Sequence, residues 1–335
     1  MTNIKIGIYG FGAITLTIAR ALEKNQIPFI IIARNLIRKE EIQNQKFKFS
    51  YAKEKTEDFE FQNRAQSIDE IKDKFDFIFI GSKTQELENS VFKALPLLSP
   101  LGKMILIQNG IPENKLDIPK ERMIGGVVGW NTQKLPDGTY FQSNSGFLIL
   151  GEVNGTSPNV ILKQLLSPFI PTILTNNLTG YRWQKLGINC VINGLAGSCL
   201  YSLGELLLNT VGRRVSLKLL NEIRSLMEKY EIKEEVVPGS IAVSKLADGQ
   251  RSLPLFLRHI ILIFLGLKYY KIRTSMVQDL DHGRETEIDH LNGIVVEMGK
   301  KVGLPTPINE KICNQIHALE KRRGMKDYEF LRSLL

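Results

Sequence analysis

Residues 4–22 read Ile4-Lys-Ile-Gly-Ile-Tyr9, then Gly10-Phe-Gly-Ala-Ile-Thr15, then Leu16-Thr-Ile-Ala-Arg-Ala-Leu22. The first part alternates and is rich in β-formers, the second is a glycine turn, and the third has helical periodicity. Gly10 permits a tight turn, and Gly12 lets a pyrophosphate approach the helix N-terminus. The stretch therefore predicts a strand, turn and helix that bind a dinucleotide. The candidate cofactor residues are Gly10, Phe11, Gly12 and Ala13.

Two positions near this turn bear on the cofactor. Thr15 replaces the third glycine of the usual fingerprint, which predicts slightly wider spacing between helix and strand. The second predicted strand, residues 28–33, ends in Arg34 instead of the acidic residue that holds an NAD ribose. A basic residue there suits a 2′-phosphate, so the sequence predicts NADP. The alternative is an ordinary surface arginine at the end of a strand.

The first half of the chain continues to alternate strands and helices. Residues 67–70 have the pattern of a capping box that opens a short helix. The later predicted elements are a strand at 75–81, a helix from 82 to about 98, strands at 103–108, 124–130, 140–143 and 147–150, and a helix that begins at Ser157-Pro158. This order predicts an open, mostly parallel sheet with helices on its faces.

Two residues follow buried strands of this sheet. Lys83 follows the strand at 75–81, and Asn109 follows the strand at 103–108. Because the carboxyl ends of the strands line the ligand crevice in such sheets, both are candidates to touch cofactor or substrate. The alternative for each is an ordinary solvated loop residue.

The second half of the chain is helical in its periodicity. Helices are predicted at 181–200, 212–229, 253–268, 284–302 and 307–321, with no convincing sheet. A turn-rich break at 170–179 divides the chain into an α/β Rossmann-type domain, 1–176, and an all-α domain, 177–335. The longest apolar run, 253–267, contains Arg258 and is too short to span a bilayer. It predicts a buried or partner-facing helix, and a homodimer through the apolar helices is one assembly the sequence allows.

Lys185, Asn189 and Asn193 are spaced four residues apart in the first of these helices. On an α-helix this spacing places an amine and two carboxamides along one face. Apolar neighbours indicate that the helix is packed, so the polar stripe needs partners or a cavity. An amine held among amides can grip and protonate a carbonyl oxygen. The alternative is a stripe that meets solvent or another helix.

A second polar group lies at 275–292. It runs from Ser275-Met-Val-Gln-Asp279 through Gly283-Arg-Glu-Thr-Glu287-Ile-Asp289. Charged helical stretches usually face solvent, so Asp279, Arg284 and Glu287 can be read as a solvated helix face.

Composition limits the partners and the compartment. The 335 residues carry a formal charge of +9 that is scattered along the chain, with no nucleic-acid motif. This charge favours anionic ligands such as NADP and carboxylates. Three cysteines show no metal spacing, and their odd number argues against a disulfide framework. With a strand at the very N-terminus and no membrane segment, we expect a cytoplasmic protein without metal or nucleic-acid ligands.

Taken together, these residues resemble the ketopantoate reductase (2-dehydropantoate 2-reductase) family. The resemblance extends from residue 4 to about 310 and is most specific in two elements, Lys-x-x-x-Asn-x-x-x-Asn and Thr-Glu-Ile-Asp. The matching positions are the turn at 10–13, Arg34, Lys83, Gln108-Asn-Gly110, Trp183-Gln-Lys185-Leu, Asn189, Asn193, Ser275-Met-Val-Gln-Asp279 and Thr286-Glu-Ile-Asp289.

The resemblance implies a Rossmann-type domain, an all-helical domain and reduction of a small 2-keto acid by NADPH. The implied reaction converts ketopantoate to pantoate, a step of pantothenate and coenzyme A biosynthesis. Lys185 would be the general acid and Glu287 a substrate-binding carboxylate at the catalytic centre. Asn109, Asn189, Asn193 and Ser275 would hold substrate and cofactor, while Gly10, Gly12, Arg34 and Lys83 would belong to the NADP site.

The chain departs from the family pattern at Thr15, at Ile111-Pro112 and across 231–274, which matches nothing in the pattern. Two alternatives therefore stay open. One is a related NADP-dependent 2-keto acid or 3-hydroxy acid dehydrogenase with another small substrate. The other is a non-catalytic NADP-binding sensor, against which the intact set of Lys185, Asn193 and Glu287 argues.

Overall fold

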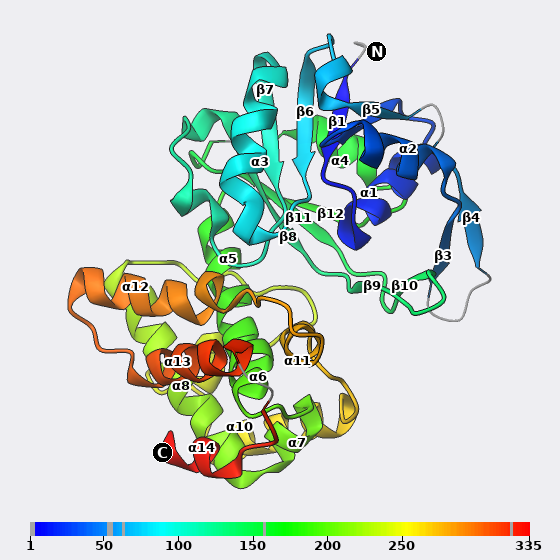
Figure 1. Ribbon diagram of the computed structural model, residues 1–335. Helices are drawn as coiled ribbons and strands as arrows, with labels where there is room; N and C mark the ends of the chain where they lie inside the picture. The colour runs from blue at the N-terminus through cyan, green and yellow to red at the C-terminus, as the bar shows by residue number, and fades with distance from the viewer. Residues whose placement is uncertain (1–3, 52–55, 62–63, 157–158, 322–323) are drawn as a thin grey trace. The chain divides into compact units, whose positions relative to one another are not determined.

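The computed structural model describes residues 4–51, 56–61, 64–156, 159–321 and 324–335. The chain forms two compact units (Figure 1). The first runs to Gln108 and resumes over Pro112–Leu178, and the second comprises Asn109–Ile111 and Thr179–Leu335.

The first unit is built on an eight-stranded sheet whose order is β12-β11-β8-β7-β6-β1-β2-β5. The strands are β1 (Ile6–Tyr9), β2 (Phe29–Ala33), β5 (Ala65–Ser67), β6 (Phe75–Ile80), β7 (Leu98–Leu106), β8 (Met123–Val128), β11 (Leu148–Glu152) and β12 (Thr172–Thr175). All neighbours are parallel except β8 and β11. The strand order reverses between β1 and β6, the position where open α/β sheets bind ligands.

Because successive side chains of β1 point to opposite faces of the sheet, this strand contributes to two hydrophobic cores, one on each face. Ile6 and Ile8 pack with residues of α1 (Ala13–Lys24) and α4 (Val160–Leu166). Tyr9 points to the other face and packs with residues of α3 (Leu87–Ala94). Helices therefore cover both faces of the sheet, as expected when both sides of every strand are apolar.

A smaller sheet, ordered β4-β3-β10-β9, belongs to the same unit. Its strands are β3 (Phe47–Tyr51), β4 (Glu57–Phe59), β9 (Thr132–Lys134) and β10 (Tyr140–Gln142). The ring of Phe11, from the glycine turn, meets Phe47 edge-on with centroids 5.2 Å apart. This aromatic contact anchors the turn to the small sheet.

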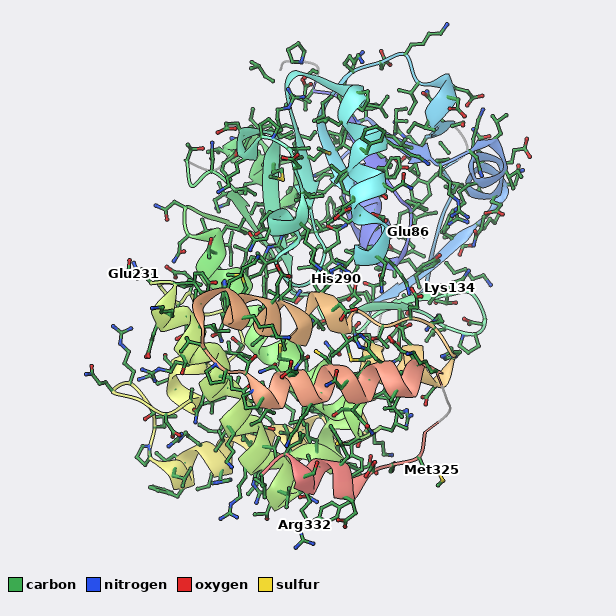
Figure 2. The ribbon with its side chains drawn as sticks, turned by 60° about the vertical axis from the view of Figure 1, so that its left-hand side comes forward. Glu86, Lys134, Glu231, His290, Met325 and Arg332 are labelled. Atoms are coloured by element: carbon green, nitrogen blue, oxygen red, sulfur yellow. The ribbon has the colours of Figure 1, made fainter. Side chains whose placement is uncertain are left out.

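The second unit is helical: none of its described residues forms a strand. Its helices are α5 (Leu178–Asn189), α6 (Ala196–Ser198), α7 (Leu203–Leu208), α8 (Thr210–Lys229), α9 (Val243–Leu246), α10 (Leu255–Lys268), α11 (Ser275–Asp281), α12 (Asn292–Val302), α13 (Pro307–Lys321) and α14 (Tyr328–Ser333). The twenty-residue α8 is central and packs against α7, α9, α12, α13 and α14. Side chains such as Glu231, Met325 and Arg332 extend outward from this unit (Figure 2).

The predicted fold class, a Rossmann-type α/β part followed by an all-α part, is confirmed. Several boundaries were wrong. The helix expected to run to residue 98 ends at Ala94, since Pro96 lacks the N–H that an α-helix needs. The supposed turn-rich break at 170–179 contains β12, which pairs with β11. Ser157-Pro158 lies outside the described residues, and α4 is capped by Asn159, whose Oδ1 accepts from the Ile161 N–H.

The single helix predicted at 284–302 was also wrong. Gly283, with φ of 63°, ends α11 in the left-handed region, and the next α-helix begins only at Asn292. Between them, the backbone N–H and the hydroxyl of Thr286 both donate to Glu320 of α13 at 2.8 Å. This contact holds the chain in a non-helical path, so Glu287 projects from a loop and a short 3-10 turn instead of from an α-helix.

The three cysteines, Cys190, Cys199 and Cys313, are free and buried in the helical unit. Among the described helices, none combines the length and the apolar character needed to cross a membrane.

Candidate active site

The glycine turn packs directly against the end of β6. Gly10 has φ of 81°, and a Cβ atom built on it would lie 2.9 Å from the Ser82 nitrogen, so only glycine fits there. At Gly12 a Cβ would meet nothing within 4 Å, which leaves the backbone at the start of α1 open on one side. The first N–H groups of a helix have no partner within it and favour an anion. The turn therefore fits a pyrophosphate.

Thr15 is accommodated by a second glycine. A Cβ built on Gly81, at the end of β6, would lie 2.2 Å from the Thr15 methyl group, so the methyl fills space that Gly81 leaves empty. The Thr15 hydroxyl donates to the Gly10 carbonyl at 3.0 Å and accepts from the Gly12 N–H at 2.9 Å. Thr15 thus closes the turn, and the N–H groups of Ala13 and Ile14 remain as the donors that a phosphate would use.

The basic candidates lie at the carboxyl ends of strands next to β1. Arg34 follows β2, is exposed, and makes no salt bridge with any described residue. Lys83 follows β6, where the Gln108 amide donates to the carbonyls of Ile80 and Ser82 and so holds the loop. A third basic residue, Arg38, was not predicted: its guanidinium donates to the Phe11 carbonyl at 3.2 Å. The sequence signal that could have identified Arg38 is its position, one helical turn after Arg34.

Lys185 lies on α5 of the helical unit and is partly buried. Burial lowers the pKa of its amine from the ordinary 10.5 to about 8. The positive charge of Arg182 contributes to this lowering, and the carboxylate of Glu287 partly opposes it. A lysine with a pKa near 8 can give up a proton close to neutral pH, which an unperturbed lysine cannot do efficiently.

The helix that carries Lys185 changes its winding after Asn189. Residues Cys190–Leu195 form a π-helical turn, so the predicted regular α-helical stripe was wrong in this part. The two asparagines still meet, because the Asn193 amide donates to Asn189 Oδ1 at 3.5 Å. Turns of this kind occur often at functional sites.

A series of hydrogen-bonded polar side chains contacts the backbone of the π-helical turn. The Asn292 amide donates to the Cys190 carbonyl at 3.5 Å and to Asn309 Oδ1 at 2.9 Å. Asn309 in turn donates to Glu222 on α8 at 2.7 Å, and burial raises the pKa of this carboxyl group. Sequence reasoning included Asn292 as the end of the polar group at 275–292, but it missed Asn309 and Glu222, which nothing local distinguishes from ordinary helix residues.

The other predicted residues of the helical unit gather around Lys185 and its stripe. Ser275, at the start of α11, donates to Asn193 Oδ1 at 3.3 Å. Asn109 follows β7 in sequence but packs with the helical unit, where its amide donates to Glu287 Oε2 at 3.2 Å. The structure thus places the candidates in two sets. One, on the sheet, comprises Gly10, Phe11, Gly12, Ala13, Arg34 and Lys83, and the other, on the helices, comprises Asn109, Lys185, Asn189, Asn193, Ser275 and Glu287.

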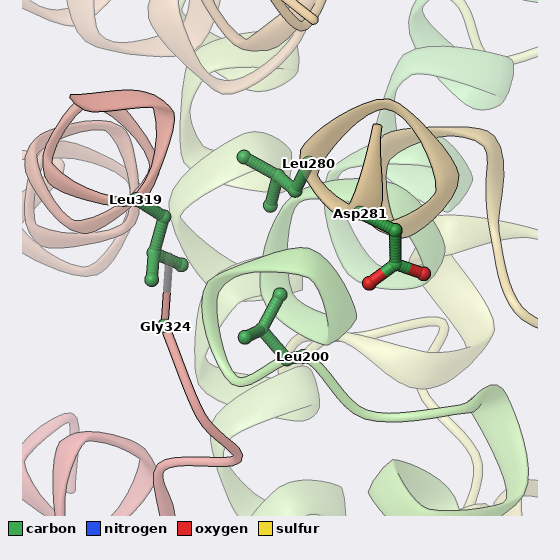
Figure 3. A pocket seen from close by; sticks show the side chains of 5 residues that line it. All are labelled: Leu200, Leu280, Asp281, Leu319 and Gly324. Atoms are coloured by element: carbon green, nitrogen blue, oxygen red, sulfur yellow. The ribbon is translucent and has the colours of Figure 1, made fainter. Parts of the chain in front are cut away.

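A pocket of about 270 Å³ lies elsewhere in the helical unit, lined by Leu200, Leu280, Asp281, Leu319 and Gly324 (Figure 3). Its described lining residues include three leucines and one carboxylate, and none of them carries a positive charge that could attract an anionic acid. The described residues hold no group of three or more potential metal ligands placed to bind an ion.

Sequence comparison identifies the family to which this arrangement belongs. The profile described as "Ketopantoate reductase PanE/ApbA" matches residues 6–155, and the one described as "Ketopantoate reductase PanE/ApbA C terminal" matches residues 177–320. The chain belongs to the ketopantoate reductase family. It is therefore an oxidoreductase of a family of dinucleotide-dependent reductases, as the resemblance implied.

Individual relatives of the ketopantoate reductase family are distant. The 2-dehydropantoate 2-reductase of Archaeoglobus fulgidus is 22% identical over 250 residues, 73% of this chain and 76% of the relative. Among solved structures, the ternary structure of D-mandelate dehydrogenase with NADH and anilino(oxo)acetate has a TM-score of 0.77 at 20% identity, covering 95% of this chain and 99% of the other. The dimeric ketopantoate reductase from Staphylococcus aureus has a TM-score of 0.72 at 18% identity, covering 96% and 100%. At these identities the structures show a shared fold.

Proposed function

We propose that this chain reduces 2-dehydropantoate (ketopantoate) to pantoate with NADPH, in the cytoplasm and as a step of pantothenate and coenzyme A biosynthesis. The observation that carries the proposal is the Lys185 amine, whose pKa burial brings to about 8 beside a row of amides and a carboxylate. The first domain, 1–176, would hold the cofactor and the second, 177–335, the substrate. A homodimer is part of the proposal.

Each candidate has a chemical task in this reaction. NADPH, when bound, supplies the hydride that adds to the keto carbon. Lys185 donates its proton to the oxygen as negative charge develops there, which is general acid catalysis. The amides of Asn189 and Asn193 and the hydroxyl of Ser275 can donate hydrogen bonds to the keto acid. Glu287, positioned by Asn109, can accept a hydrogen bond from the substrate hydroxyl.

Cofactor choice is expected to depend on Arg34. Arg34 can make charge-assisted hydrogen bonds to a 2′-phosphate, and no acidic residue stands at the end of β2 to hold a free ribose. We expect the protein to bind NADPH more tightly than NADH. Arg34→Ala should reduce the difference in binding free energy between the two cofactors by about 1.5–3 kcal/mol, the range for hydrogen bonds to charged groups. Titration of both cofactors by fluorescence measures the preference.

A matched control for Arg34 lies on the next helix. Lys39, on α2 (Leu36–Asn44), is already engaged by Glu70 at 2.9 Å, so Lys39→Ala should leave the preference unchanged. Equal affinity of the unmodified protein for NADPH and NADH would defeat the assignment of Arg34.

The rate of reduction is expected to fall as the pH rises through about 8. The acid must be protonated to act, and the pKa of Lys185 lies near 8, so kcat should be constant below that pH and decline above it. Oxidation of pantoate by NADP⁺ needs the neutral amine as a base and should rise over the same range. Opposite pH profiles in the two directions would separate this titration from alkaline unfolding, which lowers both rates.

The substrate itself is tested by following NADPH oxidation with a panel of 2-keto acids. Ketopantoate should give the highest kcat/KM. D-mandelate dehydrogenase shares the fold, so an aromatic 2-keto acid belongs in the panel as the rival substrate. If the protein binds NADPH but oxidises it with none of these acids, the non-catalytic sensor becomes the better explanation.

A further inference from the structure

The segment between α11 and α12, residues 282–291, carries Glu287 and has little regular structure. All of it is described, and its helical part is the short 3-10 turn Ile288–His290. We call this segment the Glu287 loop. Backbone N–H groups outside helices and strands need other partners, and a segment that lacks them opens easily. The position of the Glu287 carboxylate therefore depends on the contacts that hold this loop.

Glu320 of α13 holds the Glu287 loop at the residue just before Glu287. The backbone N–H and the hydroxyl of Thr286 both donate to Glu320 Oε1, each at 2.8 Å. The same hydroxyl accepts from the Ile288 N–H at 3.3 Å. Hydrogen bonds to a carboxylate are about twice as strong as those between neutral groups. One carboxylate oxygen thus fixes the backbone directly before Glu287 and, through the Thr286 hydroxyl, directly after it.

The two neighbours of Glu287 are anchored by burial as well. Thr286 and Ile288 are 6% and 1% exposed, and Ile288 belongs to the hydrophobic core of the helical unit. The Glu287 carboxylate itself accepts from the Asn109 amide at 3.2 Å, and its negative charge acts on the pKa of Lys185. The buried pair of neighbours therefore determines where this carboxylate lies relative to the amine and the amides of the candidate site.

A second contact joins α13 to the same loop, but it is exposed. His317, one helical turn before Glu320, has its Nε2 atom 3.1 Å from Asp289 Oδ1, and the two side chains are 40% and 65% exposed. Exposed ion pairs contribute little because water and salt screen them. The bonds to the buried Thr286 therefore hold the loop more firmly than this pair does, and His317 offers a matched control.

The helix α13 is a firm support for the loop. Its fifteen residues, Pro307–Lys321, pack along α8 and α12 and against the 3-10 turn of the loop (Figure 1). Glu222 of α8 holds its first turn, accepting from the N–H groups of Ile308 at 2.8 Å and of Asn309 at 3.1 Å. Side chains held by packed helices keep a site more precise than side chains held by loops alone. Glu320 thus connects a loop residue of the site to a fixed element.

We propose that Glu320 is a positioning residue that, through Thr286, holds the Glu287 carboxylate where it can accept a hydrogen bond from the substrate hydroxyl. Glu320 thereby contributes to the choice of ketopantoate over keto acids that lack this hydroxyl. The inference rests on the proposed function and adds to it a residue that acts through two others. A contact of this kind matters because a shift of a positioned group by about 1 Å can cost on the order of 10²-fold in rate.

Kinetics with two keto acids test this role. Glu320→Ala should lower kcat/KM for ketopantoate by roughly 10- to 100-fold, the scale on which such a shift acts. The value for 2-ketoisovalerate, which has no hydroxyl for Glu287 to bind, should change little. Glu320→Gln keeps an oxygen that can accept both bonds from Thr286 and should restore most of the activity with ketopantoate. His317→Ala should leave both values unchanged.

A double-mutant cycle separates positioning from a general loss of structure. If Glu320 acts through Glu287, Glu320→Ala should have little further effect in the Glu287→Ala protein, because the carboxylate that it positions is already absent. Damage that reached Lys185 would lower the rate again. Circular dichroism checks that each variant is folded. Thr286→Val, which loses the hydroxyl but keeps the N–H that donates to Glu320, should give the same pattern in weaker form.

Hydrogen–deuterium exchange tests the contact without any substrate. Peptides that cover residues 282–291 should exchange faster in Glu320→Ala than in the unmodified protein or in Glu320→Gln.

The outcomes distinguish this inference from the proposed function. Unchanged exchange in Glu320→Ala, equal losses with both acids, a Glu320→Gln variant as slow as the alanine variant, or a further loss in the Glu287→Ala protein would overturn the role of Glu320. Each of these results would leave the reductase activity intact. An unmodified protein that reduces none of the acids would overturn the reductase function and the inference with it, whatever the exchange of the loop.

Discussion

Replacing Lys185 by alanine is expected to lower kcat by roughly 10²–10⁴-fold, the usual contribution of a general acid. The amine has a pKa of about 8, so it holds its proton at neutral pH and can release it as the alkoxide forms. NADPH affinity should change little, because the glycine turn, Arg34 and Lys83, which are assigned to the NADP site, belong to the other unit. Single-turnover measurement of NADPH oxidation, with cofactor affinity measured separately, gives both quantities.

Two variants sharpen this test. Lys185→Arg keeps the positive charge, but guanidinium cannot act as an acid near neutral pH, so the variant should stay slow. Lys229→Ala removes an exposed lysine from the end of α8 and should retain normal turnover. If arginine restores the rate, Lys185 acts through its charge and not by proton transfer. If the alanine variant keeps most of its turnover, Lys185 is structural.

The second large effect concerns Glu287 and the hydroxyl of ketopantoate. An ionised carboxylate repels the substrate carboxylate but accepts a hydrogen bond from the terminal hydroxyl. A partly buried carboxylate left without that partner carries a free-energy cost, so keto acids lacking the hydroxyl should be rejected by roughly 10³-fold or more. Glu287→Ala should therefore lower kcat/KM for ketopantoate far more than for 2-ketoisovalerate, which lacks the hydroxyl. Steady-state kinetics with both acids measures the two ratios.

The chain offers a matched control two residues away. Glu285 is exposed, so Glu285→Ala should leave the discrimination between the two acids unchanged. Glu287→Gln keeps an oxygen that can accept from Asn109 and from the substrate hydroxyl, and should retain part of the discrimination. An unmodified enzyme that reduces both acids equally well would show that Glu287 does not read the hydroxyl, and another substrate would then be favoured.

The strand, turn and helix at the N-terminus could be predicted because their signals are local. Alternation along β1, glycines in the turn and periodicity in α1 occupy adjacent residues, and the family's order of motifs runs through both units. The short strands β4, β5 and β9 gave no such signal. Each has only three residues, which is too few for alternation to be distinguished from chance.

The errors in the site have a different origin, since they arise from contacts between residues far apart in sequence. Residues 284–302 keep a helical pattern of apolar positions, but the bond from Thr286 to Glu320 and the left-handed Gly283 override it. The π-helical turn at Cys190–Leu195 is likewise supported by Asn292, about a hundred residues later. Local propensity contains no information about such partners.

The contact between Thr15 and Gly81 bears on how dinucleotide sites are searched for in new sequences. A search pattern that demands a third glycine on the helix would reject this chain, although the space that this glycine usually provides is present. In this chain the glycine of the contact is Gly81, at the end of the strand β6, and the larger residue, Thr15, lies on the helix. The close contact between helix and strand thus requires a small residue at one of two positions that lie about seventy residues apart. A search for diverged dinucleotide-binding sequences should score these two positions together.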